Sequence, residues 1–214
     1  MVDLKKSNLT VYVVDDDAAL CQSLSWLLES VGLPVETFNS AQAYLEKYNV
    51  KQRGCLLLDI RMKGMSGFEL QEKLISLGNR LPIIMITGHG DIPMAVRAMK
   101  AGAVDFITKP FNDQLLLDLV QRVLAEEIER KEEADVTVTS NANNPELLER
   151  YASLTARERE IMERVVDGKL NKQIAYELGI SMKTVELHRA HVMQKMQVKS
   201  LAELVKACMQ LERV

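Results

Sequence analysis

Several polar residues stand directly after short apolar runs along the first half of the chain. They are Asp15, Asp16, Asp59, Thr87 and Lys109. A short apolar run bounded by turn residues is typical of a buried strand. In open α/β sheets, ligands bind at the carboxyl ends of the parallel strands. If the runs are neighbouring parallel strands, three carboxylates, one hydroxyl and one ammonium should meet at one edge of the sheet.

This set of side chains favours metal-assisted phosphoryl chemistry. Clustered carboxylates repel one another unless a cation joins them. Hard oxygen ligands with room for water suit Mg²⁺. Asp59 can then accept a phosphoryl group, because an aspartyl phosphate is an established covalent intermediate. Lys109 and Thr87 would hold the phosphoryl oxygens, whereas Asp17 is expected to cap a helix.

Residues 8–125 resemble a response-regulator receiver domain. The resemblance rests on the acidic pair Asp15/Asp16, on Asp59, and on Thr87, Phe106 and Lys109-Pro110 in that order. It is strongest to the FixJ-like group, through Met-Ser-Gly at 65–67, Thr-Gly-His-Gly-Asp at 87–91 and Ala-Gly-Ala-Val-Asp-Phe at 101–106.

The resemblance implies a role for each of these residues. Asp59 is the phospho-acceptor, and Mg²⁺ is held by Asp15, Asp16, Asp59 and the backbone carbonyl of Arg61. The phosphoryl-binding and switch residues are Thr87, Phe106 and Lys109. Lys63 stands where the family usually has proline, a departure that should loosen the loop but removes no ligand.

Five strands alternate with five helices in this part of the chain, which favours a parallel sheet covered on both faces. The expected strands are 10–15, 35–38, the run ending at 59, 83–87 and 104–108. Helices are expected over about 20–31, from Ser40 to about 48, and over 91–101. Another follows the loop that contains Gly64 and Gly67 and ends at about 77, and the last begins at Asn112. The resemblance implies a flavodoxin-like, doubly wound sheet of order 2-1-3-4-5.

The pattern changes after the last of these helices. The charged run 126–133 could extend the helix, and residues 134–145 are small, polar and Asn-rich, as in a linker. We therefore expect a receiver domain over 1–128, a partly helical linker over 129–150 and a second domain over 151–214.

The second domain carries the signals of a helix-turn-helix. Thr155 and Glu158 form a capping-box pattern, Asn171 is expected to cap a second helix that Gly179 closes, and Ser181 is expected to cap a third. Helix 182–196 is then the candidate recognition helix. A fourth helix is expected from about residue 201.

Residues 152–209 resemble a LuxR/FixJ/NarL-type DNA-binding domain. The motifs are Leu-Thr-Ala-Arg-Glu-Arg-Glu at 154–160, Asn-Lys-Gln-Ile-Ala at 171–175 and Thr-Val-Glu-Leu-His-Arg at 184–189. The candidate DNA contacts are Lys172, Lys183, Thr184, Glu186, Leu187, His188, Arg189, Ala190 and Lys195. The basic residues suit phosphates, and Glu186 suits a cytosine amino group unless it is simply a solvated acid. His188 and His191 have no acidic or Cys partner at metal-ligand spacing, so no metal is expected there.

Composition agrees with a globular regulator. Apolar residues make up 47% of the 214, the net charge is −3, and the three cysteines fit reduced buried thiols. Residues 151–214 carry 11 Lys and Arg against 8 Asp and Glu, a weak sign of nucleic-acid binding. No run suits a membrane span or signal peptide, so a cytoplasmic location without membrane contact is expected.

The sequence thus predicts a two-component response regulator with no separate substrate. A sensor histidine kinase would phosphorylate Asp59, and the chain would pair through helix 91–101 and strand 104–108. The homodimer would bind double-stranded DNA and RNA polymerase, with activation favoured. A hydrolase with an Asp nucleophile needs a second acid at position 61, where Arg61 stands. A receiver that does not use phosphate is the third reading, disfavoured by the intact acidic set.

Overall fold

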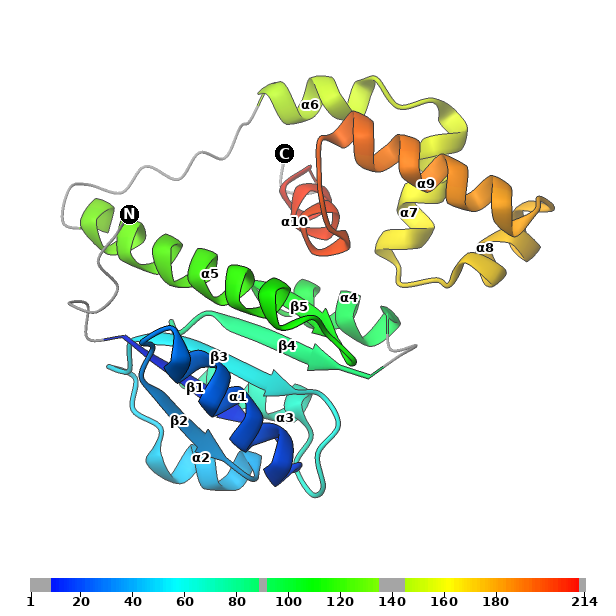
Figure 1. The fold of residues 1–214 in the computed structure, drawn as a ribbon. Coiled ribbons are helices and arrows are strands. Elements are labelled where there is room, and N and C mark those ends of the chain that lie inside the picture. The colour runs from blue at the N-terminus through cyan, green and yellow to red at the C-terminus, as the bar shows by residue number, and fades with distance from the viewer. Residues whose placement is uncertain (1–8, 89–91, 135–144, 212–214) are drawn as a thin grey trace. The chain divides into compact units, whose positions relative to one another are not determined.

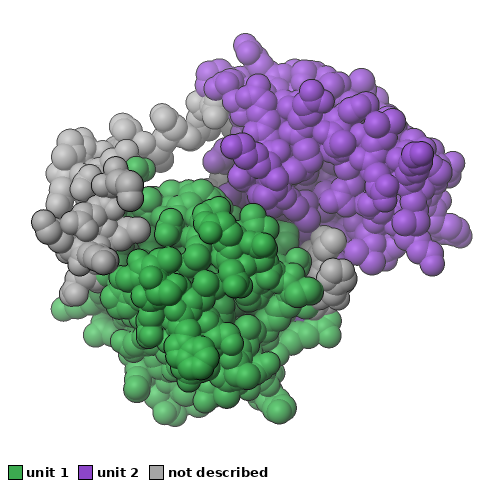
Figure 2. Space-filling view, in the orientation of Figure 1, with its two compact units in different colours: residues 1–89, 101–138 green, residues 90–100, 139–214 purple. Residues whose placement is uncertain are grey.

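The structure is a computed structural model that describes residues 9–88, 92–134 and 145–211, with residues 92 and 130–134 described by their backbone alone. Contacts divide the chain into two compact units, residues 1–89 with 101–138 and residues 90–100 with 139–214 (Figure 2). Each unit is described by itself below. Residue 91, the expected start of a helix, and residues 135–144 of the expected linker lie outside the described residues.

The first unit is built on a five-stranded parallel sheet of order β2-β1-β3-β4-β5 (Figure 1). The strands are β1 (Thr10–Val14), β2 (Val35–Phe38), β3 (Gly54–Asp59), β4 (Ile83–Thr87) and β5 (Asp105–Thr108). The order 2-1-3-4-5 and the doubly wound class are therefore confirmed. Every residue of β3 is buried, because this central strand is covered on both faces.

Helices follow the strands in alternation. They are α1 (Ala18–Ser30), α2 (Ala41–Lys47), α3 (Gly67–Ser76), α4 (Ile92–Lys100) and α5 (Asp113–Ala134). Helices α1 and α5 pack on one face of the sheet, where they meet alternate strand residues such as Val13, Leu57 and Ile84 in one apolar core. On α2, the buried Tyr44 ring makes edge-to-face contacts with Tyr12 and Phe38.

Local hydrogen bonds explain where these helices begin. The Asp17 carboxylate accepts from the amides of Ala19 and Leu20, and the Ser40 hydroxyl accepts from the amide of Ala43. The side chain of Asn112 accepts from two amides of α5. These expected caps are confirmed, and a further capping box joins Ser66 and Glu69 at α3.

The C-terminal part contains α6 (Pro145–Ala152), α7 (Ala156–Val166), α8 (Asn171–Leu178), α9 (Met182–Met196) and α10 (Leu201–Leu211). Gly179 ends α8 with a left-handed backbone, and the Ser181 hydroxyl caps α9, which spans the expected residues 182–196. Helices α8 and α9 thus form the expected helix-turn-helix.

One expected cap is wrong. The N-cap of α8 is Leu170, whose backbone amide donates to the Gln173 side chain, and Asn171 is the first helical residue. The side chain of Asn171 instead accepts a hydrogen bond from the Arg189 guanidinium. The polar side chain next to the turn therefore serves a contact between helices in place of its own helix end.

The three cysteines, Cys21, Cys55 and Cys208, are free and buried, as expected. Burial raises the pKa of Cys21 to about 11 and that of Cys55 to about 12. Within the part of the chain that the structure describes, no helix has the length and apolar character needed to cross a membrane.

Candidate acidic site and recognition helix

Strand register brings the predicted acidic residues to the same edge of the sheet. Val14 of β1 pairs with Leu58 of β3, so that Asp15 and Asp59 follow side by side. Thr87 of β4 pairs with Thr108 of β5, directly before Lys109. The four side chains therefore come from the carboxyl ends of neighbouring parallel strands, where this class of fold binds ligands.

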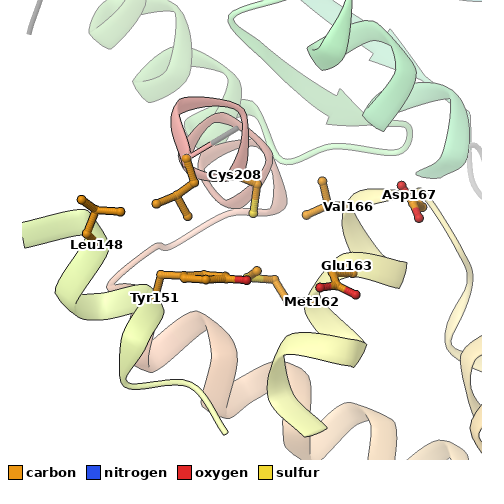
Figure 3. A pocket seen from close by; sticks show the side chains of 8 residues that line it. Leu148, Tyr151, Met162, Glu163, Val166, Asp167 and Cys208 are labelled. Carbon is orange, nitrogen blue, oxygen red and sulfur yellow. The ribbon is translucent and has the colours of Figure 1, made fainter. Parts of the chain in front are cut away.

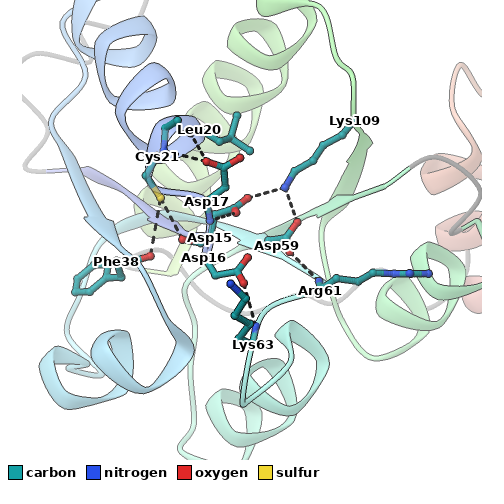
Figure 4. A network of polar contacts seen from close by, with 11 residues as sticks. Asp15, Asp16, Asp17, Leu20, Cys21, Phe38, Asp59, Arg61, Lys63 and Lys109 are labelled. Carbon is teal, nitrogen blue, oxygen red and sulfur yellow. Dashed lines mark hydrogen bonds and ion pairs between the residues drawn. The ribbon is translucent and has the colours of Figure 1, made fainter.

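The Lys109 ammonium lies between two of the carboxylates (Figure 4). Its Nζ is 2.7 Å from Oδ2 of Asp15 and 2.7 Å from Oδ1 of Asp59. Both carboxylates are buried, with 1% of Asp15 and 5% of Asp59 exposed. One cation thus pairs with two buried acids. Such pairing is needed because an isolated charge is costly in a region of low dielectric.

Burial and charge shift the pKa values of this pair. Burial raises the pKa of Asp59, and the nearby Asp15 charge adds to this, whereas the hydrogen bond from Lys109 opposes it. Burial works against the charge of Lys109, but hydrogen bonds to Asp15 and Asp59 outweigh it, so the pKa of Lys109 is raised. The lysine therefore stays charged.

The loop after β3 is fastened to the acidic residues by backbone amides. The Arg61 amide donates to Oδ2 of Asp59 over 2.8 Å, and the Lys63 amide donates to Oδ2 of Asp16 over 3.2 Å. Proline at position 63 would have no amide hydrogen, so Lys63 supplies a contact where loosening was expected. A Cβ at Gly67 would lie 2.1 Å from the backbone oxygen of Asp59, which explains glycine at this close approach.

The carboxylates fit a hard divalent cation. Ligand oxygens of Asp15, Asp16 and Asp59 all lie within 4.8 Å of one another. Asp16 is only partly buried, which leaves a way in from solvent. An all-oxygen donor set with access to water is the kind that Mg²⁺ uses in proteins.

The predicted switch residues lie beside this pocket. Thr87 is fully buried, and its hydroxyl donates to the Gly88 carbonyl over 3.5 Å. Phe106, on the neighbouring strand β5, is half-buried. The Lys109 amide donates to the Thr87 carbonyl over 2.7 Å, which links the two strand ends.

Helix α9 buries one face and exposes the other. Val185, Val192 and Met196 are buried. The outward residues Glu186, Leu187 and Ala190 are exposed, as are Lys183 on the first turn and Lys172 on α8. These five candidate DNA contacts are free to meet a partner surface.

The other four candidate contacts are at least partly engaged within the unit. Thr184 shares a hydrogen bond with Ser181, and Arg189 donates to Asn171, as described above. Lys195 lies 2.7 Å from Oε2 of Glu158, and His188 is half-buried. Burial lowers the pKa of Arg189. Packing between helices, which sequence spacing within one helix does not reveal, accounts for these contacts.

Helix α6 is the element that the sequence reading missed. Its residues Leu148 and Tyr151 line a cavity of about 500 Å³, together with Met162, Glu163, Val166 and Asp167 of α7 and its cap, and Cys208 and Leu211 of α10 (Figure 3). A usable signal was present, because proline favours the first position of a helix and Leu147, Leu148 and Tyr151 recur at helical spacing.

Two family descriptions match the chain. Residues 11–121 match the response regulator receiver domain, and residues 152–208 match the luxR family of bacterial regulatory proteins. The first match covers the acidic site and the second covers α7, α8, α9 and most of α10.

Individual proteins match over nearly the whole length. The response regulator protein TodT of Pseudomonas putida is 46% identical over 199 residues, covering 92% of this chain and 83% of its own. The transcriptional regulatory protein FixJ of Azorhizobium caulinodans is 45% identical over 199 residues, covering 93% and 91%. The solved structure of the response regulator StyR is 47% identical with a TM-score of 0.55, covering 94% of this chain and 98% of its own.

Proposed function

Because the chain belongs to the FixJ- and TodT-like response regulators, which join a receiver domain to a luxR-type helix-turn-helix, we propose that phosphorylation of Asp59 controls its binding to DNA. The chain is a two-component response regulator that acts in transcription regulation and is not a catalytic enzyme. A receiver implies a histidine kinase partner, and a helix-turn-helix implies DNA. In this proposal the receiver spans 1–128, a linker 129–150 and the DNA-binding domain 151–214.

The observation that carries the proposal is the convergence of Asp15, Asp16, Asp59 and Lys109 at one edge of the sheet. In the proposed reaction a carboxylate oxygen of Asp59 forms a bond to phosphorus while the bond from phosphorus to the kinase histidine nitrogen breaks. Lys109 is already poised beside this oxygen, and its ammonium offsets the charge of the arriving phosphoryl group. The ammonium would then pair with the phosphoryl oxygens.

A divalent cation belongs to the same proposal. Asp15, Asp16 and Asp59 would hold Mg²⁺, with the backbone carbonyl of Arg61 as a further ligand. When bound, Mg²⁺ supplies positive charge that the lysine alone does not. The fit of the three carboxylates to such an ion supports this assignment.

Thr87 and Phe106 would pass the change onward. The buried Thr87 hydroxyl has a long contact of 3.5 Å to Gly88, so little holds it against a new acceptor on Asp59. Phe106 is half-buried and would turn inward to fill the space that Thr87 leaves. This is a local charge event that biases a two-state element.

The proposed output is a homodimer that pairs through helix 91–101 and strand 104–108. Two recognition helices would then reach half-sites roughly 10 bp apart, or a multiple of this. Lys172, Lys183, Arg189 and Lys195 would meet phosphates. The exposed Glu186, Leu187 and Ala190 would face the groove, and Thr184 and the half-buried His188 complete the proposed set of DNA contacts. Bound upstream of a gene, the dimer would engage RNA polymerase and activate transcription.

Light scattering on the full chain tests the acceptor. Mass is measured with Mg²⁺ before and after a small phosphoryl donor, for the wild type, Asp59→Asn and Asp17→Asn. Asp17 caps α1, and asparagine caps helices equally well, so Asp17→Asn removes one acid and leaves the pocket intact. We expect a monomer-to-dimer shift in the wild type and Asp17→Asn, and none in Asp59→Asn.

A shift in Asp59→Asn would show that another residue is the acceptor. If the wild type takes up phosphate but stays monomeric by light scattering, phosphorylation-driven pairing is ruled out and Asp59 is still the acceptor. The hydrolase alternative predicts steady release of phosphate from added phosphomonoesters, which Arg61 at the general-acid position disfavours.

A further inference from the structure

Three side chains from distant parts of the C-terminal unit converge at the start of α7. They are Glu158 of α7 and His188 and His191 of α9, and one ligand atom of each lies within 4.8 Å of the other two. The two histidines are three residues apart on one helix, a spacing that places both on the same face. Glu158 lies 30 residues earlier in the sequence, so sequence spacing alone did not reveal it as their acidic partner.

The Glu158 carboxylate divides its contacts between its two oxygens. Oε2 accepts from the Thr155 amide over 2.8 Å and from the Lys195 ammonium over 2.7 Å. Oε1 lies 3.8 Å from Nδ1 of His191, which is too long for a hydrogen bond. The carboxylate is buried, with 5% of its side chain exposed. Oε1 therefore lies near the histidines without a hydrogen bond to His191.

The histidines differ in their access to solvent. Nδ1 of His188 is buried and has no hydrogen-bond partner among the described residues. A buried ring nitrogen without a partner is costly, and a bound ion or water is one way in which such a nitrogen is satisfied. The His191 side chain is 48% exposed, so the cluster opens to solvent on that side.

These distances suit a transition-metal ion. Zn²⁺ binds histidine nitrogen and carboxylate oxygen at about 2.0–2.2 Å, so that ligand atoms of a tetrahedral site lie roughly 3.3–3.5 Å apart. The gap of 3.8 Å between Glu158 and His191 needs only a small side-chain movement to match. We propose that Glu158, His188 and His191 bind Zn²⁺, with water in the fourth position.

The two acidic sites of the chain are then chemically distinct. The pocket of Asp15, Asp16 and Asp59 offers oxygen ligands alone and suits Mg²⁺, whereas two imidazoles and one carboxylate favour Zn²⁺ and its neighbours in the transition series. A bound Zn²⁺ would fasten the recognition helix α9 to the first turn of α7. Lys195 would keep its place on the other oxygen of Glu158.

Cobalt absorption on the full chain tests the site. Co²⁺ is titrated into the protein in the presence of excess Mg²⁺, which fills the receiver pocket. Zn²⁺ is then added to displace the bound Co²⁺. We expect one equivalent of Co²⁺ with the intense visible bands of a tetrahedral nitrogen and oxygen site. His191→Gln should weaken binding at least about tenfold. His191 is half-exposed, so this variant should fold as the wild type does.

Two controls make the result specific. His89→Gln is the same substitution at the third histidine, which lies outside the described residues, and should bind Co²⁺ as the wild type does. Asp59→Asn should also leave the signal unchanged. Equal binding in the wild type and His191→Gln, or loss of the signal in Asp59→Asn, would overturn the proposal. Failure to bind any Co²⁺ in the presence of Mg²⁺ would overturn it as well.

Discussion

At the scale of single residues, Glu158 performs more tasks than its place in a capping box requires. It closes the first turn of α7, pairs with Lys195 and faces two histidines. The Lys195 hydrogen bond, opposed by burial and supported by Thr155, lowers the pKa of Glu158 to about 2. Because the folded-state pKa lies below the ordinary value, ionised Glu158 stabilises the fold above about pH 4.3. That stability is lost as the pH falls toward 2.

The pair makes a testable contribution to stability. With a chelator present, Lys195→Met should lower the free energy of unfolding at pH 7 by about 1–3 kcal/mol, because it leaves a buried carboxylate with one donor fewer. The deficit should shrink as the pH falls from about 4.3 toward 2, since Glu158 becomes protonated in both proteins.

Urea unfolding measures this difference. Trp26, the single tryptophan, lies on α1 and reports the first unit, so the remaining change in circular dichroism reports the second. Lys172→Met replaces an exposed lysine of α8 and should change stability by less than about 0.5 kcal/mol. A deficit for Lys195→Met that is the same at pH 7 and at pH 2 would contradict the role assigned to the ionised carboxylate.

The sequence predicted the role of single residues correctly where their hydrogen-bond partners lie in the same short segment. Asp17, Ser40 and Ser181 act on amides within three residues, so the local sequence was sufficient to identify them as caps. It failed for Asn171, and it gave no sign of the Glu158 contact made by Lys195, because these partners come from other helices. A polar side chain at a helix end has several possible hydrogen-bond partners, and packing decides among them.

At the scale of elements, the loop from β3 to α3 holds the acidic site together through its backbone. The Gly67 amide donates to the Ile60 carbonyl over 3.0 Å, and the missing Cβ lets the chain pass close to Asp59. The amides of Arg61 and Lys63 in the same loop reach two carboxylates. The loop thus determines where the acids point.

Alanine at Gly67 should disturb this loop. Gly67→Ala would place a Cβ 2.1 Å from the Asp59 backbone oxygen, so we expect a loss of about 3 kcal/mol in the free energy of unfolding. Phosphorylation by a small donor should also slow. Gly64→Ala is the matched control, because its φ is +79° but no atom lies within 4 Å of the added carbon. It should cost about 1–2 kcal/mol and leave the phosphorylation rate near that of the wild type.

Helix α6 makes a second element-level prediction possible. Leu147 is 6% exposed, whereas its neighbour Leu148 is 41% exposed. Leu147→Ala should therefore destabilise the second unit by about 2–4 kcal/mol, and Leu148→Ala should cost less than half as much. Hydrogen exchange of the α9 amides in the full chain measures both. Equal protection in the two variants would show that α6 does not support the recognition helix.

Most elements followed from sequence because apolar periodicity and caps agreed. Strands 35–38 and 83–87 and helix 182–196 have the expected bounds. Helix α6 was missed because the Asn-rich stretch before it was extended too far as a linker. Leu147 buries little surface within its own short helix, and only packing with other helices of the unit makes it part of a core.

At the scale of the whole molecule, the charge is unevenly distributed. Residues 151–214 carry an excess of Lys and Arg, while the rest of the chain is acidic. Phosphate contacts release counterions, so affinity for DNA should fall steeply with salt. The exposed Lys183 at the start of α9 should contribute to this slope.

Binding to DNA at several salt concentrations tests that contribution. Lys183→Ala should weaken binding to all sequences alike and reduce the slope of log affinity against log salt by about 1. Lys51→Ala removes an exposed lysine of the first unit and should leave the slope unchanged. An unchanged slope in Lys183→Ala would remove this lysine from the set of phosphate contacts.

The three buried cysteines can serve as natural probes of local unfolding. Cys21 and Cys55 report on the helix and central strand beneath the acidic site, and Cys208 reports on α10. A thiol that is shielded and has a raised pKa reacts with an alkylating reagent only while its surroundings are open. Mass spectrometry of the labelled peptides would then measure the rate of local opening in each unit separately, without any substitution in the protein. Comparison with and without a phosphoryl donor would reveal which unit the signal reaches first.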